Sequence, residues 1–335
     1  MGSTAMNWSE LDWSALDRLR QNFLGGSNAA GPYWQTPEDL ANYDFTYGER
    51  IGWKWDHVLR ELRMRGWTPG PAARAVFDWG CGSGIAARRV ISFFGAENFD
   101  ALTVWDHSPL ACDFAADAAR REFPALSVAQ ATPGLLTAEV PIGLLIVSHV
   151  LNELPAPALE SLRALIARAN AVLWVEPGTH AVSRQLGAIR DGLCDTFQVV
   201  APCPHGLPCP VFTAGNERHW CHFFAPPPSE IFANSEWVKF GHRAGIDLRS
   251  LPYCFFALDR NPVTAHPAGG SRVIGRVEHF KPYARLLNCD ASGLAELELP
   301  KRADPALFKQ LERTKAPLLY RWRRDGDKIL GGEAL

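Results

Sequence analysis

The sequence predicts an α/β protein whose core is a mostly parallel, doubly wound sheet. Between residues 71 and 262, short apolar runs alternate with longer segments that have helical periodicity. Strands that are separated by helices are joined by right-handed crossovers, which give a parallel sheet covered on both faces. A glycine-rich turn, Gly80–Gly84, follows the first of these strands. Together these features predict a Rossmann-like fold.

Residues 1–70 precede this alternation and form a predicted N-terminal helical region. Helical periodicity occurs in Asp12–Phe23 and again in Gly48–Arg65. The second stretch places apolar side chains on one face, at spacings of three and four: Ile51, Trp55, Val58, Leu59 and Leu62. Gly66 and the run Pro69–Pro71 end this helix, because neither residue type continues it.

Residues 71–262 form the predicted Rossmann-like domain. Its first four strands are Ala75–Asp78, Ala101–Asp106, Gly143–Ser148 and Ala171–Glu176. The helices that follow them are Ile85–Phe94, Leu110–Phe123, Ala158–Ala169 and His180–Leu193. A helix around Ser229–Ala244 and a strand at Tyr253–Leu258 complete the domain. Residues 196–228 are rich in Cys, Pro and His and lack periodicity, so this insertion needs another source of order.

Residues 263–335 form a predicted small, β-rich extension. Short alternating segments occur at Val273–Val277, Ala284–Asn288 and Leu294–Leu299. From Glu236 onward, 17 Lys and Arg stand against 12 Asp and Glu, although the whole chain has a net charge of −2. This balance excludes a wholly basic nucleic-acid binder but permits phosphate contacts by the extension, the alternative being an ordinary solvated surface. If RNA binds, six basic residues should share one face, whereas a scattered arrangement would favour a small-molecule substrate. The six are Arg272, Arg276, Lys281, Arg285, Lys301 and Arg302.

The composition is that of an ordinary globular protein, with 47% hydrophobic and 21% charged residues. No run reaches the roughly 18 apolar residues that a membrane-spanning helix needs. The N-terminus lacks the basic and apolar regions of a signal peptide. We therefore expect a cytoplasmic protein, a monomer, whose eight cysteines do not form disulfides.

The turn after the first strand reads Asp78-Trp-Gly80-Cys-Gly82-Ser-Gly84. Glycines at alternate positions let the backbone turn sharply and approach a ligand closely. The following helix N-terminus favours a carboxylate or a phosphate. We expect Asp78 to reach an amino group of the ligand, and Asp106, at the end of the second strand, to accept hydrogen bonds from ribose hydroxyls.

This turn is compatible with two kinds of cofactor, a dinucleotide and S-adenosylmethionine. The run from Gly82 to Ala87 also fits a loose dinucleotide fingerprint. The aspartate two residues before the first glycine is typical of methyltransferases, as are Asn152–Leu154 and Glu176–Gly178. The sequence therefore favours a class I methyltransferase fold that binds S-adenosylmethionine. The alternative is a glycine turn that only allows close packing of strand and helix.

The segment after the third predicted strand carries the candidate catalytic residues. Such folds place residues there that face both cofactor and substrate, and we assign Ser148 to the cofactor. His149 is a candidate general base, although a lone histidine at a strand end often has a packing or hydrogen-bonding role. Asn152 and Glu153 are further candidates. The chain lacks both an N-P-P-Y segment and the cysteine motif of pyrimidine C5 methylation, so the reaction stays open.

Three cysteines in the irregular insertion, Cys203, Cys209 and Cys221, lie close enough in sequence to bind one ion. Soft thiolates select zinc or iron–sulfur clusters. Cys289 in the extension is the predicted fourth ligand. Three histidines offer a zinc site instead, namely His205, His219 and His222. The remaining cysteines are predicted to be small buried hydrophobes: Cys81, Cys112, Cys194 and Cys254. A site without metal is the other alternative, because the Cys203–Cys209 spacing is not a standard zinc spacing.

Five motifs together resemble the mitochondrial small-ribosomal-subunit methyltransferase-like assembly factors and their bacterial relatives. They are Asp78–Gly84, Leu151–Leu154, Glu176–Gly178, Cys203–Cys209 and Trp220–Phe223. The resemblance implies a class I methyltransferase fold, association with small-subunit ribosomal RNA, and a [4Fe–4S] cluster held by four cysteines. Cys203, Cys209 and Cys221 match three of these, and Cys289 is the counterpart of the fourth.

The first functional hypothesis is a ribosome-associated protein that binds S-adenosylmethionine and carries this cluster. A small-molecule methyltransferase with a structural zinc site is the first alternative. An assembly factor that has kept the fold and lost catalysis is the second. The methyl acceptor and the methylated atom do not follow from the sequence.

Overall fold

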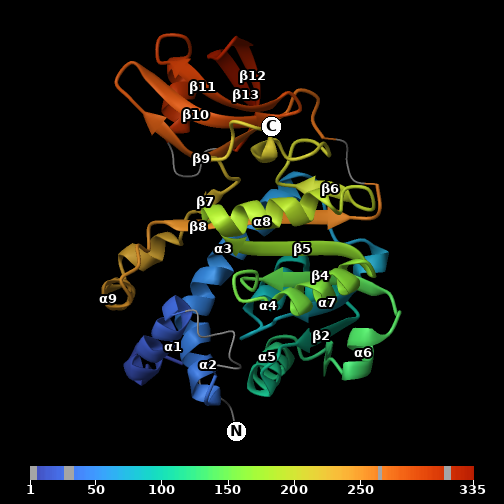
Figure 1. Cartoon of the computed structure of the whole chain (residues 1–335). Coiled ribbons are helices and arrows are strands. Elements are labelled where there is room, and N and C mark those ends of the chain that lie inside the picture. The colour runs from blue at the N-terminus through green and yellow to red at the C-terminus, as the bar shows by residue number, and fades with distance from the viewer. Residues whose placement is uncertain (1–5, 26–33, 263–265, 313–317) are drawn as a thin grey trace. The chain divides into compact units, whose positions relative to one another are not determined.

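The computed structural model describes residues 6–25, 34–262, 266–312 and 318–335. The chain divides into two compact units (Figure 1). The first comprises residues 1–63, 68–175 and 227–251, and the second comprises residues 64–67, 176–226 and 252–335. None of the described helices is both long and apolar enough to cross a membrane.

The first unit begins with helices, as predicted. They are η1 (Trp8–Glu10), α1 (Trp13–Gly25), α2 (Pro37–Tyr43), the π-helical turn η3 (Asp44–Gly48) and α3 (Glu49–Met64). The two predicted helices correspond to α1 and α3, whereas α2 was not predicted. Its start is fixed by a capping box between Thr36 and Asp39, with Pro37 in the first turn. α3 buries Trp55, Leu59 and Leu62, as the periodicity indicated.

The sheet of the first unit is parallel, in the order β3-β2-β1-β4-β5. Its strands are β1 (Ala75–Trp79), β2 (Ala101–Trp105), β3 (Ser127–Gln130), β4 (Ile142–Ser148) and β5 (Ala169–Pro177). The predicted Rossmann-like fold is thereby confirmed. The sequence missed β3, because none of the side chains of this edge strand is fully buried and it therefore has no apolar run. Glu176 consequently lies in the fifth strand, not in the fourth.

Four helices lie at nearly the predicted positions: α4 (Ile85–Phe94), α5 (Pro109–Glu122), α7 (Ala156–Ile166) and, in the second unit, α8 (His180–Asp191). The short helices η5 (Ala96–Asn98) and α6 (Pro133–Thr137) were not predicted. Figure 1 shows α4, α5 and α7 alongside the strands that they connect. The helix predicted around Ser229–Ala244 consists of two pieces, η7 (Ser229–Phe232) and α9 (Ser235–Ala244). Asn234 separates them because its side chain caps α9.

Besides α8, the second unit contains the strands β6 (Gln198–Ala201), β7 (Phe223–Ala225) and β8 (Leu251–Asp259) and a barrel. β8 pairs antiparallel with β6 and also pairs with β7. The 3₁₀ turn η6 (Pro210–Phe212) lies between β6 and β7, and the rest of residues 196–228 is irregular. The prediction of an irregular insertion is thus correct apart from its two short strands.

The predicted β-rich extension is a closed five-stranded barrel. Its elements are β9 (Ser271–His279), β10 (Tyr283–Asp290), β11 (Gly293–Pro300), α10 (Pro305–Leu311), β12 (Leu319–Asp325) and β13 (Lys328–Ala334). The strands close in the order β10-β11-β13-β12-β9, and β11 runs parallel to β13. Leu307, Phe308 and Leu311 of α10 join the apolar core of the barrel. In chain order this is the 1-2-3-5-4 arrangement of an OB-fold. Only the first three strands were predicted.

Candidate functional sites

The glycine-rich turn joins β1 to α4 in the first unit. The amides of Gly80 and Cys81 both donate to the Trp105 carbonyl, at 2.7 and 2.9 Å. Gly80 and Gly84 have φ angles of 70° and 75°, which favour glycine. A Cβ on Gly80 would lie 2.7 Å from Val150 Cγ1, and one on Gly84 would lie 2.9 Å from Ala115 Cβ. The turn therefore requires glycine at these two positions for steric as well as conformational reasons.

Two polar side chains at this turn are buried without hydrogen-bond partners among the described residues. Asp78, at the end of β1, is 1% exposed, and neither of its carboxylate oxygens is paired. The Ser83 hydroxyl is equally buried and equally unpaired. Burial raises the pKa of Asp78 to about 7; the Ala87 amide faces the carboxyl group and partly offsets this, without hydrogen-bond geometry. Because unpaired buried polar groups are costly, both are suited to receive a ligand.

Asp106 follows β2 and faces the same turn. Its Oδ2 accepts from the Gly82 amide at 3.0 Å, and its Oδ1 accepts from the Ser108 amide at 2.9 Å. Burial raises the pKa of Asp106, and these hydrogen bonds act in the opposite direction. A carboxylate has about four acceptor positions, so it keeps capacity for ribose hydroxyls after holding the turn. The predicted residues Asp78, Gly80, Gly82, Gly84 and Asp106 are therefore brought together.

A chain of hydrogen bonds links α3 to the end of β4. The Lys54 Nζ lies 3.0 Å from His149 Nε2, and the His149 Nδ1 lies 3.2 Å from Ser148 Oγ. The Trp55 indole nitrogen donates to the same Ser148 Oγ at 2.9 Å. An ammonium group and an indole N–H only donate, so His149 Nε2 must accept and its Nδ1 must carry the proton. The Ser148 oxygen then accepts twice, and its own proton is left to donate.

His149 is held in an unusual backbone conformation, with a φ angle of 57°. Burial lowers the pKa of His149 well below its usual range, and the positive charges of Lys54 and Arg50 lower it further. The imidazole is therefore neutral at neutral pH, which agrees with the hydrogen-bond pattern. Both ring nitrogens are already engaged, so His149 is not poised to take a proton from a substrate.

The other catalytic candidates differ in their surroundings. Asn152 is exposed in the turn after β4. Glu153 is half-buried and lies near Tyr43, whose pKa is raised, first by burial and then by the charge of Glu153. Arg50 also faces this region, and its Nε is buried without a hydrogen-bond partner among the described residues. The sequence missed Arg50, Lys54 and Trp55 as site residues, because their helix offered only an amphipathic pattern.

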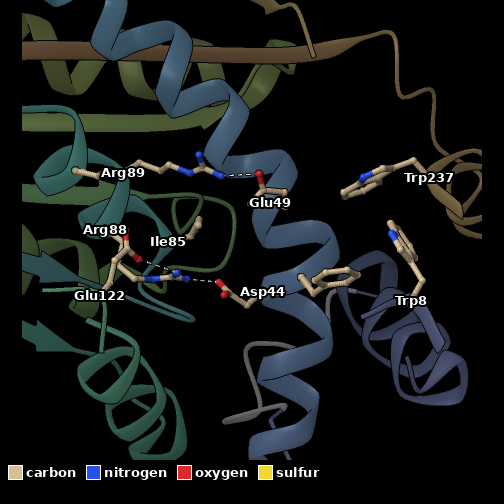
Figure 2. Close-up of a pocket in the computed structure, with 10 residues that line it drawn as sticks. Trp8, Asp44, Glu49, Ile85, Arg88, Arg89, Glu122 and Trp237 are labelled. Atoms are coloured by element: carbon tan, nitrogen blue, oxygen red, sulfur yellow. Dashed lines mark hydrogen bonds and ion pairs between the residues drawn. The ribbon is translucent and has the colours of Figure 1, made fainter. Parts of the chain in front are cut away.

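A cavity of about 540 Å³ lies beside α4 in the first unit. Figure 2 shows its two walls: Trp8 and Trp237 on one side, and the charged side chains of α4 on the other. Arg88 pairs with Asp44 and Glu122, and Arg89 pairs with Glu49. Three carboxylates thus stand against two guanidinium groups in the cavity wall, all of them in ion pairs, and none of the predicted site residues lines the cavity.

The four predicted cysteine ligands lie near one another in the second unit. Burial raises the pKa of Cys221 most, followed by the charges of Cys203, Cys209 and Cys289. Burial and the charge of Cys203 raise the pKa of Cys209 to about 12. Among the described residues, no three His, Cys, Asp or Glu side chains are arranged as ready ligands of one ion. The thiols are therefore gathered within electrostatic range but are not preset in ligand geometry.

Two buried arginines accompany these thiols. Arg190 of α8 is 3% exposed and donates to the carbonyls of His205 and Leu207, at 2.9 and 2.7 Å. Asp191 beside it accepts from the Cys209 amide at 2.9 Å. Arg272 of β9 is 1% exposed, and its guanidinium lies 4.1 Å from the centre of the Phe223 ring. Asp191 compensates the charge of Arg190 directly, at 2.7 Å. Burial raises the pKa of Cys209, Cys221 and Cys289, so these thiols are protonated when no metal is bound.

The three histidines of the zinc alternative occupy different places. The Nε2 of His205 lies 3.8 Å from Cys289 Sγ. His219 accepts from Arg218 Nε at 3.1 Å, and His222 stacks on Trp220 with ring centres 4.5 Å apart. In the described part of the chain, His205 is the only one of the three that contacts a predicted thiol ligand.

The remaining cysteines were predicted to be buried hydrophobes. Cys81, Cys112 and Cys254 are buried, and the Cys254 thiol donates to the Pro177 carbonyl. Cys194 is only partly buried, which corrects its prediction, and the charge of nearby Cys203 contributes to raising its pKa after burial. Its thiol donates to the Arg190 carbonyl at 3.3 Å. Cys194 is thus a further thiol near the predicted ligands.

Comparisons with known proteins give one family and several distant structures. Residues 56–278 match the family described as mitochondrial small ribosomal subunit Rsm22. No curated protein matches the chain. The cytoplasmic location expected above stays a prediction, since the description of this family names the mitochondrion.

Solved structures that resemble the chain include methyltransferases. Magnesium protoporphyrin IX methyltransferase from Synechocystis PCC 6803 is 15% identical, with a TM-score of 0.37 over 76% of this chain and 100% of that one. The 16S rRNA methylase RmtB is 12% identical, with a TM-score of 0.36 over 75% and 76%. A putative RNA methyltransferase from Pyrococcus horikoshii is 11% identical, with a TM-score of 0.37 over 61% and 84%. Likeness at this level carries no information on activity.

Proposed function

Because the chain belongs to the mitochondrial small ribosomal subunit Rsm22 family, we propose that it is a methyltransferase-like protein that binds S-adenosylmethionine and acts on or assembles the small ribosomal subunit. In this proposal it also carries a [4Fe–4S] cluster on Cys203, Cys209, Cys221 and Cys289. Small-subunit ribosomal RNA is the proposed partner.

The observation that carries the cofactor proposal is the buried, unpaired carboxylate of Asp78 beside the glycine-rich turn. A positively charged amino group would satisfy both of its oxygens. The α4 N-terminus and the Ser83 hydroxyl would hold the carboxylate of the same amino acid moiety. Asp106 would accept from the ribose, and Ser148 would donate to the ligand. S-adenosylmethionine supplies an electrophilic methyl group when bound.

The cluster proposal is supported by the donor set. Four thiols lie within electrostatic range of one another, and the buried guanidinium groups of Arg190 and Arg272 lie among them. A cluster with four thiolate ligands carries net negative charge, which these cations would balance. Binding of the cluster would draw the thiols into coordination geometry. The free energy of cluster binding would thereby become folding free energy of the insertion.

A second candidate is an assembly factor that binds the cofactor without turnover. The engagement of both His149 nitrogens favours it, because this histidine, which adjoins Ser148, is not free to accept a proton from a substrate. The zinc-containing small-molecule methyltransferase rests on one contact, that of His205 with Cys289.

Two measurements test the proposal. Calorimetry with S-adenosylmethionine and with NAD should show binding of the first only. Anaerobic purification followed by iron, sulfide and zinc analysis should give about four iron and four sulfide per chain. One zinc per chain would favour the small-molecule alternative. Binding of NAD alone would overturn the proposal that S-adenosylmethionine is the cofactor.

A further inference from the structure

The barrel of the second unit has an architecture that many proteins use for nucleic acids. β9, β10 and β11 are antiparallel neighbours, β11 and β13 are parallel, and β12 closes onto β9. α10 lies between the third and fourth strands and fills the core. In OB-folds, oligonucleotides bind to the face of the second and third strands, to the loop between the first two strands and to the loop between the last two. A fold alone does not establish a function, so the side chains on this surface determine whether it can bind a nucleic acid.

The turn between β9 and β10 presents an aromatic platform. Phe280 is 39% exposed at the turn. Its ring stacks on Tyr283, with centres 4.8 Å apart and planes 26° from parallel. The Arg285 guanidinium lies 5.1 Å from the centre of the Phe280 ring. An exposed flat ring that is supported from behind is the kind of side chain on which bases stack.

Three exposed cations surround this platform. Lys281 lies in the same turn, and the Lys301 amide donates to the Pro282 carbonyl at 2.9 Å, which places Lys301 and Arg302 beside it. The pairing of Tyr283 with Pro300 fixes this neighbourhood. Within the described ranges, no ion pair involves Lys281, Lys301 or Arg302. The Lys301 ammonium lies 5.2 Å from the centre of the Phe308 ring, a contact that leaves its charge uncompensated by any carboxylate. The charge of all three is therefore available to phosphates.

The rest of the barrel surface is less suited to RNA. Arg272 is buried and Arg276 lies over Phe224, so the prediction that six basic residues share one face is wrong. This outcome favours a small-molecule substrate over RNA for that wider face, and it restricts the RNA inference to the hairpin end. The other end of β10 and β11 faces the cysteine-rich insertion, through the pairs Arg218–Glu296 at 2.8 Å and His205–Cys289. The turn between β12 and β13 carries Asp325 and Asp327, which repel phosphates. The hairpin end also carries a carboxylate, Glu278, which pairs with Arg285 at 3.3 Å. It is nevertheless where aromatic side chains and basic side chains without ion pairs coincide.

We propose that this hairpin end, formed by Phe280, Lys281, Tyr283, Lys301 and Arg302, binds single-stranded RNA. A base stacks on Phe280, and neighbouring phosphates contact the three cations. A duplex hides its base faces, so the platform selects unpaired nucleotides. This inference rests on the proposed function, because it takes the RNA to be that of the small ribosomal subunit.

The test is fluorescence anisotropy of the full chain with a labelled single-stranded RNA of about ten nucleotides, a length within the range of one OB-fold. The double variant Lys281→Glu/Arg302→Glu is compared with the control Arg323→Glu/Lys328→Glu, which makes the same charge change on β12 and β13. We expect the first to weaken binding at least tenfold and to flatten the dependence of log affinity on log salt by about 1.4, or 0.7 per phosphate contact. The control should retain wild-type affinity.

Phe280→Ala separates stacking from charge. We expect about a tenfold loss of affinity with an unchanged salt slope, and Phe280→Trp should restore binding. Unlabelled single strands should compete, whereas a hairpin duplex should not. Circular dichroism and S-adenosylmethionine affinity should match the wild type in every variant, because these side chains are exposed.

The outcomes separate two failures. If the wild-type chain binds no RNA, the ribosomal part of the proposed function is overturned. If the wild type binds but the hairpin variants bind equally well, or the control loses as much affinity, only the hairpin inference is overturned. Competition by the duplex as strong as that by the single strand would also overturn it.

Discussion

Lys54 lies 3.0 Å from His149, Nζ to Nε2, although 95 positions separate the two residues in the chain. The contact joins the N-terminal helix α3 to the end of β4, where the predicted catalytic residues lie. It fixes the histidine as the tautomer protonated on Nδ1, because the ammonium group can only donate. The N-terminal helices are therefore part of the candidate site and do not merely precede it.

Lys54→Met should raise the pKa of His149, since the positive charge of Lys54 lowers it. Burial lowers this pKa more than Lys54 does, so the pKa should stay below the usual value. The ring proton shifts of His149 in an NMR titration measure the change. Lys239→Met, in the exposed pair with Glu236, is the matched control. An identical titration in both variants would contradict the contact.

The stability of the ligand-free protein should fall as pH rises from about 4 to about 7 because of Asp78. Its folded-state pKa is about 7, above the usual aspartate pKa of 3.8. The folded state thus binds more protons than the unfolded state in this window, and deprotonation favours unfolding. Between pH 5 and pH 8, the free energy of unfolding of the wild type should fall by roughly 2–4 kcal/mol, at about 1.4 kcal/mol per pKa unit. Asp78→Asn should remove this decline.

Urea unfolding at the two pH values measures this difference, with the exposed Asp117→Asn as control. Equal pH dependence in wild type and Asp78→Asn would show that the carboxyl group titrates normally.

Asp106→Ala should weaken binding of S-adenosylmethionine by about 1–3 kcal/mol, because ribose hydroxyls would lose their acceptor. The variant also removes the acceptor of the Gly82 amide, so the glycine-rich turn should loosen. Calorimetry measures the affinity, and Asp100→Ala, exposed before the same strand, is the control. Unchanged affinity would exclude the ribose from this position.

Cys289→Ser should lower metal content and loosen both the 196–228 insertion and the barrel, if a cluster joins them. The first unit should stay folded and keep its cofactor affinity. Cys254→Ser is the control, since its thiol lies in β8 and donates to a backbone carbonyl. Metal analysis gives the first readout and hydrogen exchange the second, and the wild type should absorb broadly near roughly 400 nm.

The cysteine variants also test the choice of ligand. Loss of metal from Cys254→Ser together with retention by Cys289→Ser would show that the fourth ligand was chosen wrongly. Metal content unaffected by either variant would remove the four-cysteine site.

Most of the sheet was predictable because its central strands are buried on both faces. β4 and β5 read as continuous apolar runs, and such runs between helices have few other interpretations. β3, β12 and β13 were missed for the opposite reason. β12 carries Arg321, Arg323 and Arg324 on exposed positions, so its sequence shows no apolar run, and only pairing with its neighbours makes it a strand.

Three features could be inferred from residues close together in the chain: the parallel sheet, the glycine-rich turn with its flanking aspartates, and the thiols of the insertion. Three others emerge from the folded chain alone: the tautomer of His149, the closure of the barrel, and the approach of Cys289 to His205, residues 84 positions apart. Contacts of that kind are set by strand pairing and packing between distant segments. Local periodicity and spacing carry no record of which distant segments will meet.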